Sequence, residues 1–516
     1  MTALEPIQDR TYYAETAADQ AMRPPLRGEL DVDVCVIGGG LAGLTAAREI
    51  ARRGWSVVVL EARRIAGAAS GRNTGFVIPG FATDLTAIAE RVGSEDAREL
   101  WSLSERGLDY VRDTIRSLRL RSAAMTPGGW LHVSKVDDED RQRAYAETLS
   151  RDFGVTALGH WPRERVLSVL KSPLYFGALH YERGFSIHPL NYALGLAEAA
   201  EAAGARIFEQ TPAEALDPAG VRKRIVTPDG RIRAAHVVLA GNIQADRLLA
   251  TTAGTLVPIT TYVVVTSPLG ERLTEAVATK AAVSDTDLAN NHYRVVEDGR
   301  LMWSGRSTVW PGDPRRYVRA LQDDMARAFP QLGPVGIDFA WRGTLANTTH
   351  RMPQIGETMP GVWVLSGFGG HGLNTTAMGG ALIASAITDG DTRWRLFTSF
   401  PLVWAGGLVG RAAAQVYSYA FDRRERRASK QAFARAGSVL PAVMLSPPVE
   451  ADEAPAQDEG PASAVSPEVA DAAQFASREP SSTAAKRAGR QRRRRRTSGA
   501  RKQQLTTDPA PDVQEP

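Results

Sequence analysis

One segment near the N-terminus constrains the fold of this chain more than any other. The run VDVCVI at 32–37 is short, apolar and β-branched, as expected of a buried parallel strand. Helix-forming residues follow at 41–53, and Gly54 stands where the C-terminal cap of a helix belongs. A second apolar run at 55–60 ends at Glu61. This order predicts a strand, a helix and a second, parallel strand.

Three glycines between the first strand and the helix, Gly38, Gly40 and Gly43, form the pattern G-x-G-x-x-G. The first allows a tight turn, the second lets backbone approach a pyrophosphate, and the third lets helix and strand pack closely. Glu61 lies 18 residues after Gly43, where an acid can accept hydrogen bonds from the ribose hydroxyls of an adenosine. Because all of this context is present, the segment predicts a dinucleotide site rather than a unit that binds nothing.

Two other glycine-rich stretches extend this unit. Residues 62–85 include GAASGRNTGF, a loop of small residues that lets backbone approach a bulky planar ligand. Far along the chain, a strand at 362–365, the turn GFGGHGLN and a helix at 375–388 repeat the strand–turn–helix order. The N–H groups at the start of this second helix are expected to face the same ligand.

The middle of the chain has a different character. Strands near 256–266, 292–296 and 301–304 are rich in Thr, Val, Tyr and Trp, and a helix at 314–329 follows. We interpret the region 255–345 as an antiparallel sheet with helices, inserted between pieces of the dinucleotide-binding domain.

Much of the positive charge lies in the C-terminal tail. The formal net charge is +4 and the pI is near 9.1, but residues 486–502 alone carry the run Arg492–Arg496. From about 446 onward the chain has too few apolar residues to offset its ordering entropy, so we expect disorder. The arginine run is interpreted as a solvated tail, with weak, salt-sensitive binding to polyanions such as nucleic acid or acidic lipid as the alternative.

The chain has a single cysteine, Cys35, inside the first strand, where a small buried hydrophobe is favoured over a reactive thiol. One cysteine excludes an internal disulfide and a cysteine metal cluster, and indicates a reducing, cytoplasmic compartment. We predict no metal site. The sequence shows no signal peptide and no uninterrupted apolar run of 18 residues, so no transmembrane segment is expected.

From Tyr12 to about Arg427 the chain resembles the D-amino-acid-oxidase-like flavoproteins, and within them the gamma-glutamylputrescine oxidase branch. The matching stretches are VCVIGGGLAGLTAA, VVVLEA, GAASGRNTGF, VPITTYVVVTSPL, the WRG…THRMPQIG segment and GFGGHGLN. The individual glycine motifs are unspecific, but the ASGRN and GHG segments are specific in combination and order.

The resemblance implies an α/β fold class (α+β overall), in which a Rossmann-like FAD-binding domain is interleaved with an antiparallel-sheet substrate domain. The segments implied are an N-terminal arm at 1–30; the FAD-binding domain at 31–85, 185–254 and 340–400; the substrate domain at 86–184 and 255–339; a helical segment at 401–440; and a disordered basic tail at 441–516.

The implied activity is oxidation of a small-molecule amine or amino acid by an enzyme that binds FAD non-covalently. One hypothesis is an oxidase that passes electrons to dioxygen and releases hydrogen peroxide. In a second it is a dehydrogenase that passes them to a quinone or a carrier protein. A third hypothesis is a flavin-bearing binding protein without turnover. The family supports an aliphatic amine, such as a polyamine or its acylated derivative, as the substrate.

The cofactor-binding residues that the resemblance implies come from six places in the chain. They are Gly38, Gly39, Gly40, Leu41, Ala42 and Gly43; Glu61, Ala62 and Arg63; Ala69, Ser70, Asn73, Thr74 and Gly75; Ala213, Ala240 and Gly241; and Gly369, Gly370, His371, Gly372, Leu373 and Asn374.

Three residues are predicted to act on the substrate beside the flavin: His371, Tyr293 and Arg294. For His371 the alternative is a structural imidazole that bonds a turn carbonyl, and for Tyr293 and Arg294 it is ordinary alternation along a strand. Arg294 is expected to grip a distal carboxylate, while Tyr262, Tyr293 and Trp341 offer apolar walls for a chain. Trp341 is more often a core residue than such a wall.

One departure from the family pattern bears on the substrate. Several amino-acid oxidases of this superfamily hold the substrate carboxylate with an arginine two residues after a glycine, and Leu345 stands at that place here. Leucine cannot replace a bidentate arginine. This argues against a simple α-amino acid held in the usual way, although a carboxylate partner is available from Arg294, Arg306, Arg342 or Arg351.

Overall fold

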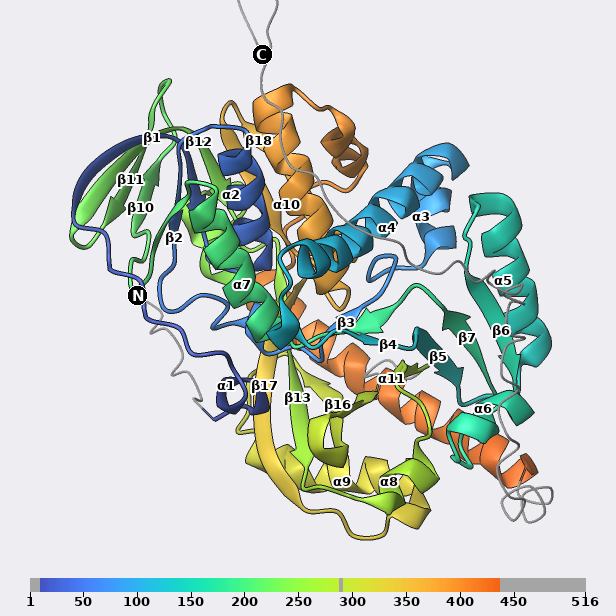
Figure 1. Cartoon of the computed structure of the whole chain (residues 1–516). Helices are drawn as coiled ribbons and strands as arrows, with labels where there is room; N and C mark the ends of the chain where they lie inside the picture. The colour runs from blue at the N-terminus through green and yellow to red at the C-terminus, as the bar shows by residue number, and fades with distance from the viewer. Residues whose placement is uncertain (1–9, 287–290, 437–516) are drawn as a thin grey trace, which may run out of the picture. The chain divides into compact units, whose positions relative to one another are not determined.

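Two eight-stranded sheets organise the residues that the computed structural model describes, 10–286 and 291–436 (Figure 1). The tail predicted at 441–516, with its arginine run, lies outside these residues. The short helix α1 (Tyr12–Glu15) begins the described chain, and its N-cap Thr11 accepts a hydrogen bond from the Ala14 N–H.

The first sheet has a parallel centre, as its short apolar strands predict. In spatial order this centre comprises β9 (Arg206–Phe208), β2 (Val57–Leu60), β1 (Gly28–Ile37), β12 (Gly230–Leu239) and β19 (Val362–Ser366). Every residue of β2 and β19 is buried, because both faces of this part of the sheet are covered. Three antiparallel strands extend it: β10 (Ala215–Asp217), β11 (Lys223–Thr227) and β18 (Gln354–Met359).

One helix, α10 (Gly372–Asp389), lies at the centre of the helical layer over this sheet. It packs between α2 (Leu41–Arg52) and α4 (Ser94–Ser117), while α7 (Pro189–Ala202) packs on α2 and α3 (Leu85–Val92) packs on α4. Figure 1 shows α2, α7 and α10 side by side in front of the strands. The predicted nucleotide-binding halves, far apart in the sequence, therefore meet through α2 and α10.

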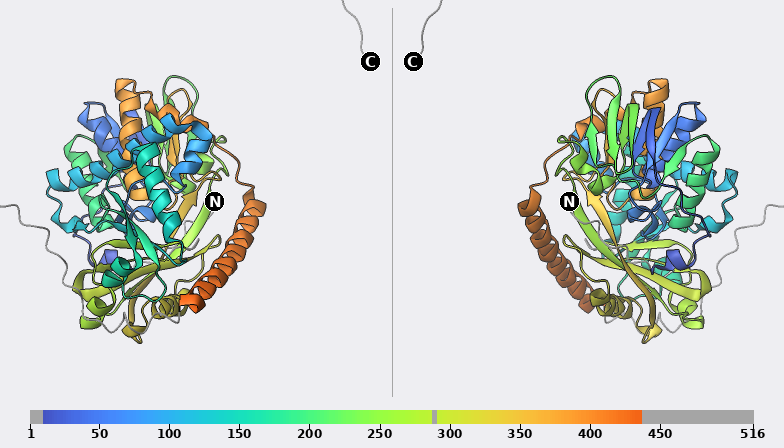
Figure 2. Two further views of the ribbon diagram at one scale, coloured as in Figure 1. Left: turned by 90° about the vertical axis from the view of Figure 1, so that its right-hand side faces the viewer. Right: turned by 90° about the vertical axis from the view of Figure 1, so that its left-hand side faces the viewer.

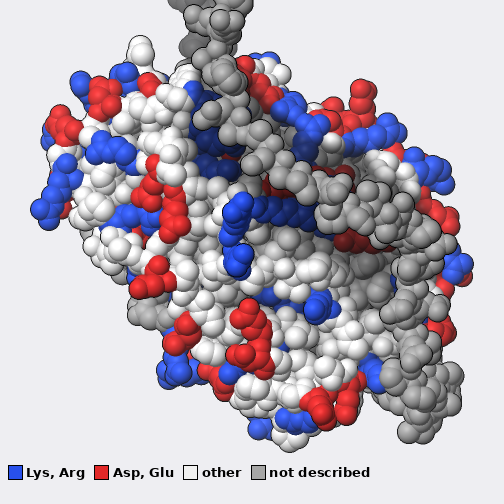
Figure 3. Space-filling view, viewed as in Figure 1, with Lys and Arg blue, Asp and Glu red and all other residues white. Residues whose placement is uncertain are grey.

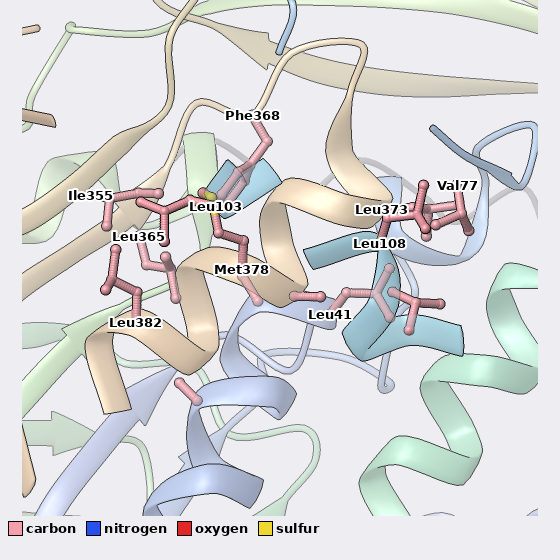
Figure 4. Packing of buried hydrophobic residues seen from close by; sticks show 14 of the residues in the cluster. Leu41, Val77, Leu103, Leu108, Ile355, Leu365, Phe368, Leu373, Met378 and Leu382 are labelled. Atoms are coloured by element: carbon pink, nitrogen blue, oxygen red, sulfur yellow. The ribbon is translucent and has the colours of Figure 1, made fainter. Parts of the chain in front are cut away.

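Glycines let these helices approach each other closely. A Cβ atom on Gly380 of α10 would lie 2.7 Å from the Ala42 carbonyl oxygen in α2. One on Gly107 of α4 would lie 2.1 Å from the Asn374 carbonyl oxygen in α10. Apolar side chains fill the space around these contacts, as Figure 4 shows for Met378. The positions of α2, α4 and α10 are thus fixed to within the size of a methyl group.

The second sheet is antiparallel except for one pair, β14 and β5, which run parallel. Its spatial order is β17 (Ile337–Asn347), β13 (Val257–Thr266), β16 (Arg300–Thr308), β15 (His292–Val296), β14 (Ala282–Asp285), β5 (Trp130–Ser134), β7 (Gly177–Tyr181) and β6 (Leu158–Pro162). The parallel pair arises because β5 and β14 come from the two separate segments that build this sheet.

The two faces of the second sheet have different neighbours. Three helices pack on one face, where they bury Tyr262, Tyr293 and Trp303: α6 (Arg163–Val169), α8 (Glu271–Ala276) and α9 (Arg315–Ala328). The opposite face is directed toward the first sheet and its loops, with Val263 and Trp341 packed against Tyr13. Alternation along each strand therefore decides whether a residue belongs to a separate core or to the space between the sheets.

The predicted fold class is confirmed. Strand β17 pairs within the second sheet, although residues 340–347 fall in the segment predicted for the first domain. Helix α4, within the predicted substrate segment 86–184, packs against α10 of the first layer. The division into domains otherwise stays a prediction, because all described residues fall within one compact unit.

The remaining elements connect or flank these layers. Strands β3 (Phe76–Val77), β8 (Phe185–Ser186) and β4 (Thr126–Pro127) form a small sheet, and α5 (Glu139–Phe153) packs beside β6. Helix α11 (Gly407–Ala436) runs along the outside in both views of Figure 2, and Gln415 on it accepts a hydrogen bond from the Val309 N–H at 2.8 Å. No helix in the described ranges is long and apolar enough to cross a membrane.

Acidic and basic side chains are interspersed over the face drawn in Figure 3. Many of them pair locally, as Arg224 does with Asp217 at 2.7 Å on the edge hairpin. Exposed pairs of this kind contribute about 0–1 kcal/mol each. They balance charge on the surface, and the stability of the fold depends on the buried contacts of the helical layer and the sheets.

The contact at Gly107 yields a prediction with a defined sign. In a helix, Gly→Ala normally stabilises by about 1 kcal/mol, because alanine has the higher helix propensity. Gly107→Ala should instead destabilise by about 1–3 kcal/mol, since the added methyl meets the Asn374 carbonyl oxygen at 2.1 Å. Thermal unfolding measures the change. The control is Gly159→Ala on β6, where a Cβ meets nothing within 4 Å; equal effects at both positions would contradict the packing argument.

Candidate active site

A cavity of about 930 Å³ lies between the two sheets, with walls from both. The first layer contributes the start of α2, residues 69–85 and the turn before α10. The second sheet contributes residues on the face directed toward the first layer, among them His132, Val263 and His292. A volume of this size is typical of sites for cofactors and their substrates.

The start of α2 forms one end of the cavity. Gly40, Leu41 and Ala42 line it, and the Leu41 N–H donates to the Ser70 hydroxyl at 3.0 Å. A Cβ on Gly40 would lie 2.9 Å from that hydroxyl, so a side chain there is excluded. The first N–H groups of a helix lack partners within the helix and carry partial positive charge, which suits a pyrophosphate.

Gly38 and Gly43 act behind this surface and do not line the cavity. Gly38 has φ +119°, and a Cβ there would lie 2.7 Å from Ala240 and Gly241 backbone atoms. A Cβ on Gly43 would lie 2.1 Å from the Gly38 carbonyl oxygen. These contacts agree with the roles that the sequence predicted for the first and third glycines, a tight turn and close packing.

Glu61 lies beneath the glycine turn. Its carboxylate accepts hydrogen bonds from the Gly39 N–H at 2.8 Å and from the Arg63 N–H at 2.9 Å. Burial raises the pKa of Glu61, and these two backbone hydrogen bonds act in the opposite direction. Each carboxylate oxygen keeps a lone pair beyond these bonds, so Glu61 retains the capacity to accept from a ribose hydroxyl.

The turn before α10 forms another wall. Gly369, Gly370, His371, Gly372 and Leu373 all line the cavity. A Cβ on Gly370 or Gly372 would meet nothing within 4 Å, so the backbone there borders open space where a flat ring system fits. The starts of α2 and α10 therefore converge on one cavity, as the two glycine-rich motifs predicted.

The loop between these helix starts is held by its own side chains. Asn73 donates to the carbonyl oxygens of Ala69 at 3.0 Å and Ser70 at 2.9 Å, and it accepts from the Gly75 N–H at 2.9 Å. Asn73 and Thr74 line the cavity together with Ala69 and Ser70. The other predicted cofactor residues lie behind the cavity lining: Gly39, Glu61, Ala62, Arg63, Gly75, Ala213, Gly241 and Asn374.

Arg294 does not line the cavity, contrary to the sequence prediction of a carboxylate partner. Its buried guanidinium donates to the Thr74 carbonyl oxygen at 2.9 Å, the Ile187 carbonyl oxygen at 2.9 Å and the Tyr13 hydroxyl at 3.2 Å. The side chain thus ties the cavity loop, the segment after β8 and the N-terminal helix to β15, which makes it a positioning residue.

The other predicted side chains of the second sheet are core residues. Tyr293 points to the face under α9, where its hydroxyl donates to Tyr175 at 3.0 Å and its ring stacks on Trp303 at 4.4 Å. Tyr262 stacks on Tyr317 at 3.7 Å. Trp341 is fully buried and donates to the Arg72 carbonyl oxygen at 3.0 Å. None of the three is among the residues that line the cavity, so the structure does not place the predicted apolar walls there.

The aromatic walls come instead from α4, β5 and β7. Trp130 and Tyr181 line the cavity and stack on each other at 4.8 Å, and Trp101 packs against Tyr181. Tyr145 lines it too and donates to Asp84 at 2.8 Å; among the described residues, Asp84 is the only acid in the lining. Sequence reasoning missed this set because its members lie on separate elements and share no local motif.

The position of His371 is compatible with both roles that the sequence left open, and its action on a substrate stays a prediction. Its ring lines the cavity, while its interaction with the Pro79 carbonyl is that of a structural imidazole. Burial lowers the pKa of His371 to about 4, and the neighbouring His292 acts in the same direction. Burial also lowers the pKa of His292 to about 4 and lowers the pKa of His132. At neutral pH all three cavity histidines are therefore uncharged.

The lining places one of the four candidate arginines at the cavity. Leu345 on β17, the position compared above with the arginine of several amino-acid oxidases, lines the cavity, and exposed Arg351 lines it from the loop after β17. Arg306 instead pairs with Asp324 at 2.6 Å, and Arg342 donates to the Gly312 carbonyl oxygen at 2.8 Å.

Comparison with known proteins decides the family. A family model described as FAD dependent oxidoreductase matches residues 33–386, more than half of the chain. The chain belongs to this family. It is 33% identical to gamma-glutamylputrescine oxidoreductase of Escherichia coli (strain K12) over 399 residues, 76% of this chain and 92% of that protein.

Solved structures show the same fold at low identity. Glycine oxidase from Bacillus cereus ATCC 14579 superposes with a TM-score of 0.60 at 19% identity, covering 72% of this chain and 98% of that one. L-proline dehydrogenase from P.horikoshii superposes with a TM-score of 0.59 at 20% identity, covering 73% and 100%.

FAD is therefore the cofactor of this oxidoreductase, and the cavity fits it. The bare backbone at Gly40 and the start of α2 suit the pyrophosphate, and the open space beside Gly370 and Gly372 suits a flat ring. When bound, FAD supplies a two-electron acceptor for amine or amino-acid oxidation. The only cysteine, Cys35, is buried in β1, and burial raises its pKa, so it is not a site of attachment.

Glu61→Ala should weaken FAD binding while the apoprotein stays folded. The substitution removes an acceptor for the ribose and leaves the Gly39 and Arg63 N–H groups without their partner. A charged hydrogen bond contributes about 1.5–3 kcal/mol, which corresponds to roughly 10- to 150-fold in affinity. Titration of apoprotein with FAD, followed by flavin fluorescence, measures it. Glu61→Gln, with a single acceptor oxygen, should be intermediate; unchanged affinity in both variants would refute the role.

Arg294→Ala should lower stability and flavin retention and leave substrate preference unchanged. It removes the donor of the Thr74 carbonyl and leaves the buried Ile187 carbonyl without its donor, which costs about 1–3 kcal/mol at Ile187. Thermal unfolding and the flavin content of the purified protein report the loss. A variant with wild-type stability but a raised KM for carboxylated substrates would instead support the predicted contact between Arg294 and a substrate carboxylate.

Proposed function

We propose that this protein oxidises an aliphatic primary or secondary amine, such as a polyamine or an acylated polyamine, to an imine that hydrolyses to an aldehyde. Dioxygen is the electron acceptor in this proposal. For a primary amine the net reaction is RCH₂NH₂ + O₂ + H₂O → RCHO + NH₃ + H₂O₂. The substrate loses one hydrogen from carbon and one from nitrogen, and its two electrons leave in hydrogen peroxide.

The observation that carries this proposal is the lining of the cavity beneath the second sheet. Leu345 occupies the place of the family's carboxylate-binding arginine, and the aromatic faces of Trp101, Trp130 and Tyr181 suit an aliphatic chain. His132, His292 and His371 are uncharged there. These uncharged side chains give a carboxylate no cationic partner, which a buried carboxylate needs, so this part of the lining favours a neutral amine.

The relationship to gamma-glutamylputrescine oxidoreductase supports an acylated amine among the candidates. The alignment with that protein covers 92% of its length, so it includes both sheets of the fold. The substrate in its name is an aliphatic amine whose other end is acylated. We transfer this class of substrate, and not the particular acyl group, to the protein described here.

A second candidate function is amino-acid oxidation with a relocated carboxylate clamp. Arg351, on the loop after β17, supports it because this arginine lines the cavity and is exposed. A guanidinium there offers the bidentate geometry that a carboxylate requires. The two candidates differ in whether a substrate without a carboxylate is oxidised.

The amine must react in its neutral form, because only that form has a lone pair to support loss of hydride from carbon. Burial in the cavity disfavours the ammonium form of the amine. Below the pKa of the free amine, kcat/KM should therefore rise about tenfold per pH unit. Burial lowers the pKa of His371 to about 4. His371 is therefore neutral at every pH well above 4, and its titration should not change kcat/KM between there and the pKa of the amine.

A panel of amines and α-amino acids tests the proposed function. Mixed anaerobically with the holoenzyme, aliphatic amines should bleach the flavin absorbance, and α-amino acids should not. Under air, turnover with hydrogen peroxide release identifies an oxidase, and turnover only with an added dye identifies a dehydrogenase. Arg351→Ala should leave amine turnover unchanged.

Two results would contradict the proposal. If α-amino acids bleach the flavin and amines do not, the second candidate replaces it, and Arg351→Ala should then raise KM. If kcat/KM for an amine is independent of pH below the pKa of that amine, the neutral form is not the one that the cavity selects.

A further inference from the structure

Pairing across the second sheet places two histidines in one row on the cavity face. His132 on β5 pairs with Ser284 on β14, and Ser284 pairs with His292 on β15. His292 in turn pairs with Ser304 on β16. Residues in register across neighbouring strands share a face, and His132, His292 and Ser304 all line the cavity.

Each of these two imidazoles has one buried nitrogen. The Nδ1 atoms of His132 and His292 are inaccessible to water and have no hydrogen-bond partner among the described residues. The rings themselves line the cavity. The nitrogen that a bound molecule can reach is therefore Nε2 in both residues.

The buried nitrogen also decides where the proton sits. A buried N–H without an acceptor is rarer and costlier than an acceptor with a free lone pair. The buried Nδ1 atoms have no acceptor beside them, so the neutral tautomer carries its proton on Nε2. His132 and His292 consequently present two N–H donors to the cavity.

Burial keeps both rings neutral. Burial lowers both pKa values, to about 4 for His292, and the ring of His132 lowers that of His292 further. Asp285 acts on both rings in the opposite direction, and Asp84 does so on His132. Burial outweighs these carboxylates, so the donors stay uncharged at neutral pH.

The lining around this pair matches a chain that carries an oxygen. The ring of His132 packs against Trp130 at 5.4 Å, and that of His292 meets the edge of Phe76 at 5.8 Å. Aromatic faces pack against methylene groups, and two neutral N–H donors can form hydrogen bonds to a neutral acceptor such as a carbonyl oxygen. A carboxylate would be desolvated there without a cation beside it.

We propose that His132 and His292 are specificity-determining residues that bind a carbonyl oxygen on the substrate, at a distance along the chain from the amine that is oxidised. The inference rests on the proposed amine oxidation and narrows its substrate to an amine with an acyl group. In this proposal the two histidines bind the far end of the substrate. Arg294 does not, because its guanidinium donates to Thr74, Ile187 and Tyr13.

Three amines with chains of similar length test the assignment. They are N-(4-aminobutyl)acetamide, which has a neutral carbonyl; heptylamine, which has no oxygen; and 6-aminohexanoate, which has a carboxylate. His132→Leu and His292→Leu should each lower kcat/KM for the acetamide about fivefold relative to heptylamine, the effect of one neutral hydrogen bond. His132→Gln and His292→Gln should restore the preference, because the glutamine amide places a donor near the position of Nε2.

His160 provides a matched control. It pairs with Leu179, which pairs with His132, so it stands in the same row, but it does not line the cavity. His160→Leu should leave the ratio of acetamide to heptylamine at its wild-type value. Flavin content and thermal unfolding of every variant separate a change of recognition from a change of folding.

The outcomes distinguish the inference from the function on which it rests. An equal loss for acetamide and heptylamine, or an unchanged ratio in both leucine variants, overturns the assignment. Dependence of 6-aminohexanoate alone on the histidines overturns it in favour of a carboxylate. If the wild-type enzyme oxidises none of the three amines, the proposed function fails. Calorimetric titration of the acetamide into wild-type and leucine-variant holoenzyme then tests the binding site alone: an equal affinity in both overturns it.

Discussion

The close packing of α10 against α2 and α4 is the contact on which the rest of the structure depends. It requires glycine at 107 and 380, because the backbone of one helix lies where the Cβ atom of another would be. The same contact sets where α2 and α10 begin, and both beginnings line the cavity. Two helix N-termini, from segments more than 300 residues apart, thus line one cavity. The FAD site is a consequence of how the helical layer packs.

Alternation along one strand of the second sheet separates structural from functional side chains. On β15, Tyr293 faces α9 and completes an aromatic core, while His292 faces the cavity. Arg294 also faces the first layer, but backbone carbonyls use its hydrogen-bonding capacity. A displacement of one residue along this strand would exchange these roles. The register of β15 therefore decides the chemistry of the substrate end.

The first layer was predictable from the sequence because its signals are local. Strand, glycine turn, helix and acid follow one another within 30 residues from Val32 to Glu61, and each has a known conformational reason. The substrate end was not predictable in the same way. Trp101 lies on α4, Trp130 and His132 lie on β5, and Tyr181 lies on β7, so the strand residues reach one wall only through the pairing of β5 with β7. The composition of residues 292–296 predicted strand β15, but it does not indicate which face of the strand is directed toward the cavity.

The contacts of Arg294 and β1 have a consequence for the order in which the molecule assembles. Strand β1, complete at residue 37, pairs with β12, which ends at residue 239, and β12 pairs with β19, which ends at residue 366. The Tyr13 hydroxyl accepts a hydrogen bond from Arg294, and α2 packs against α10, so neither contact can form until the later partner has been synthesised. Contacts of such sequence separation form slowly, because a long loop must close before any contact is gained. On the ribosome, the N-terminal third of the chain emerges without its neighbours, and the cofactor site closes only after residue 389 has been synthesised.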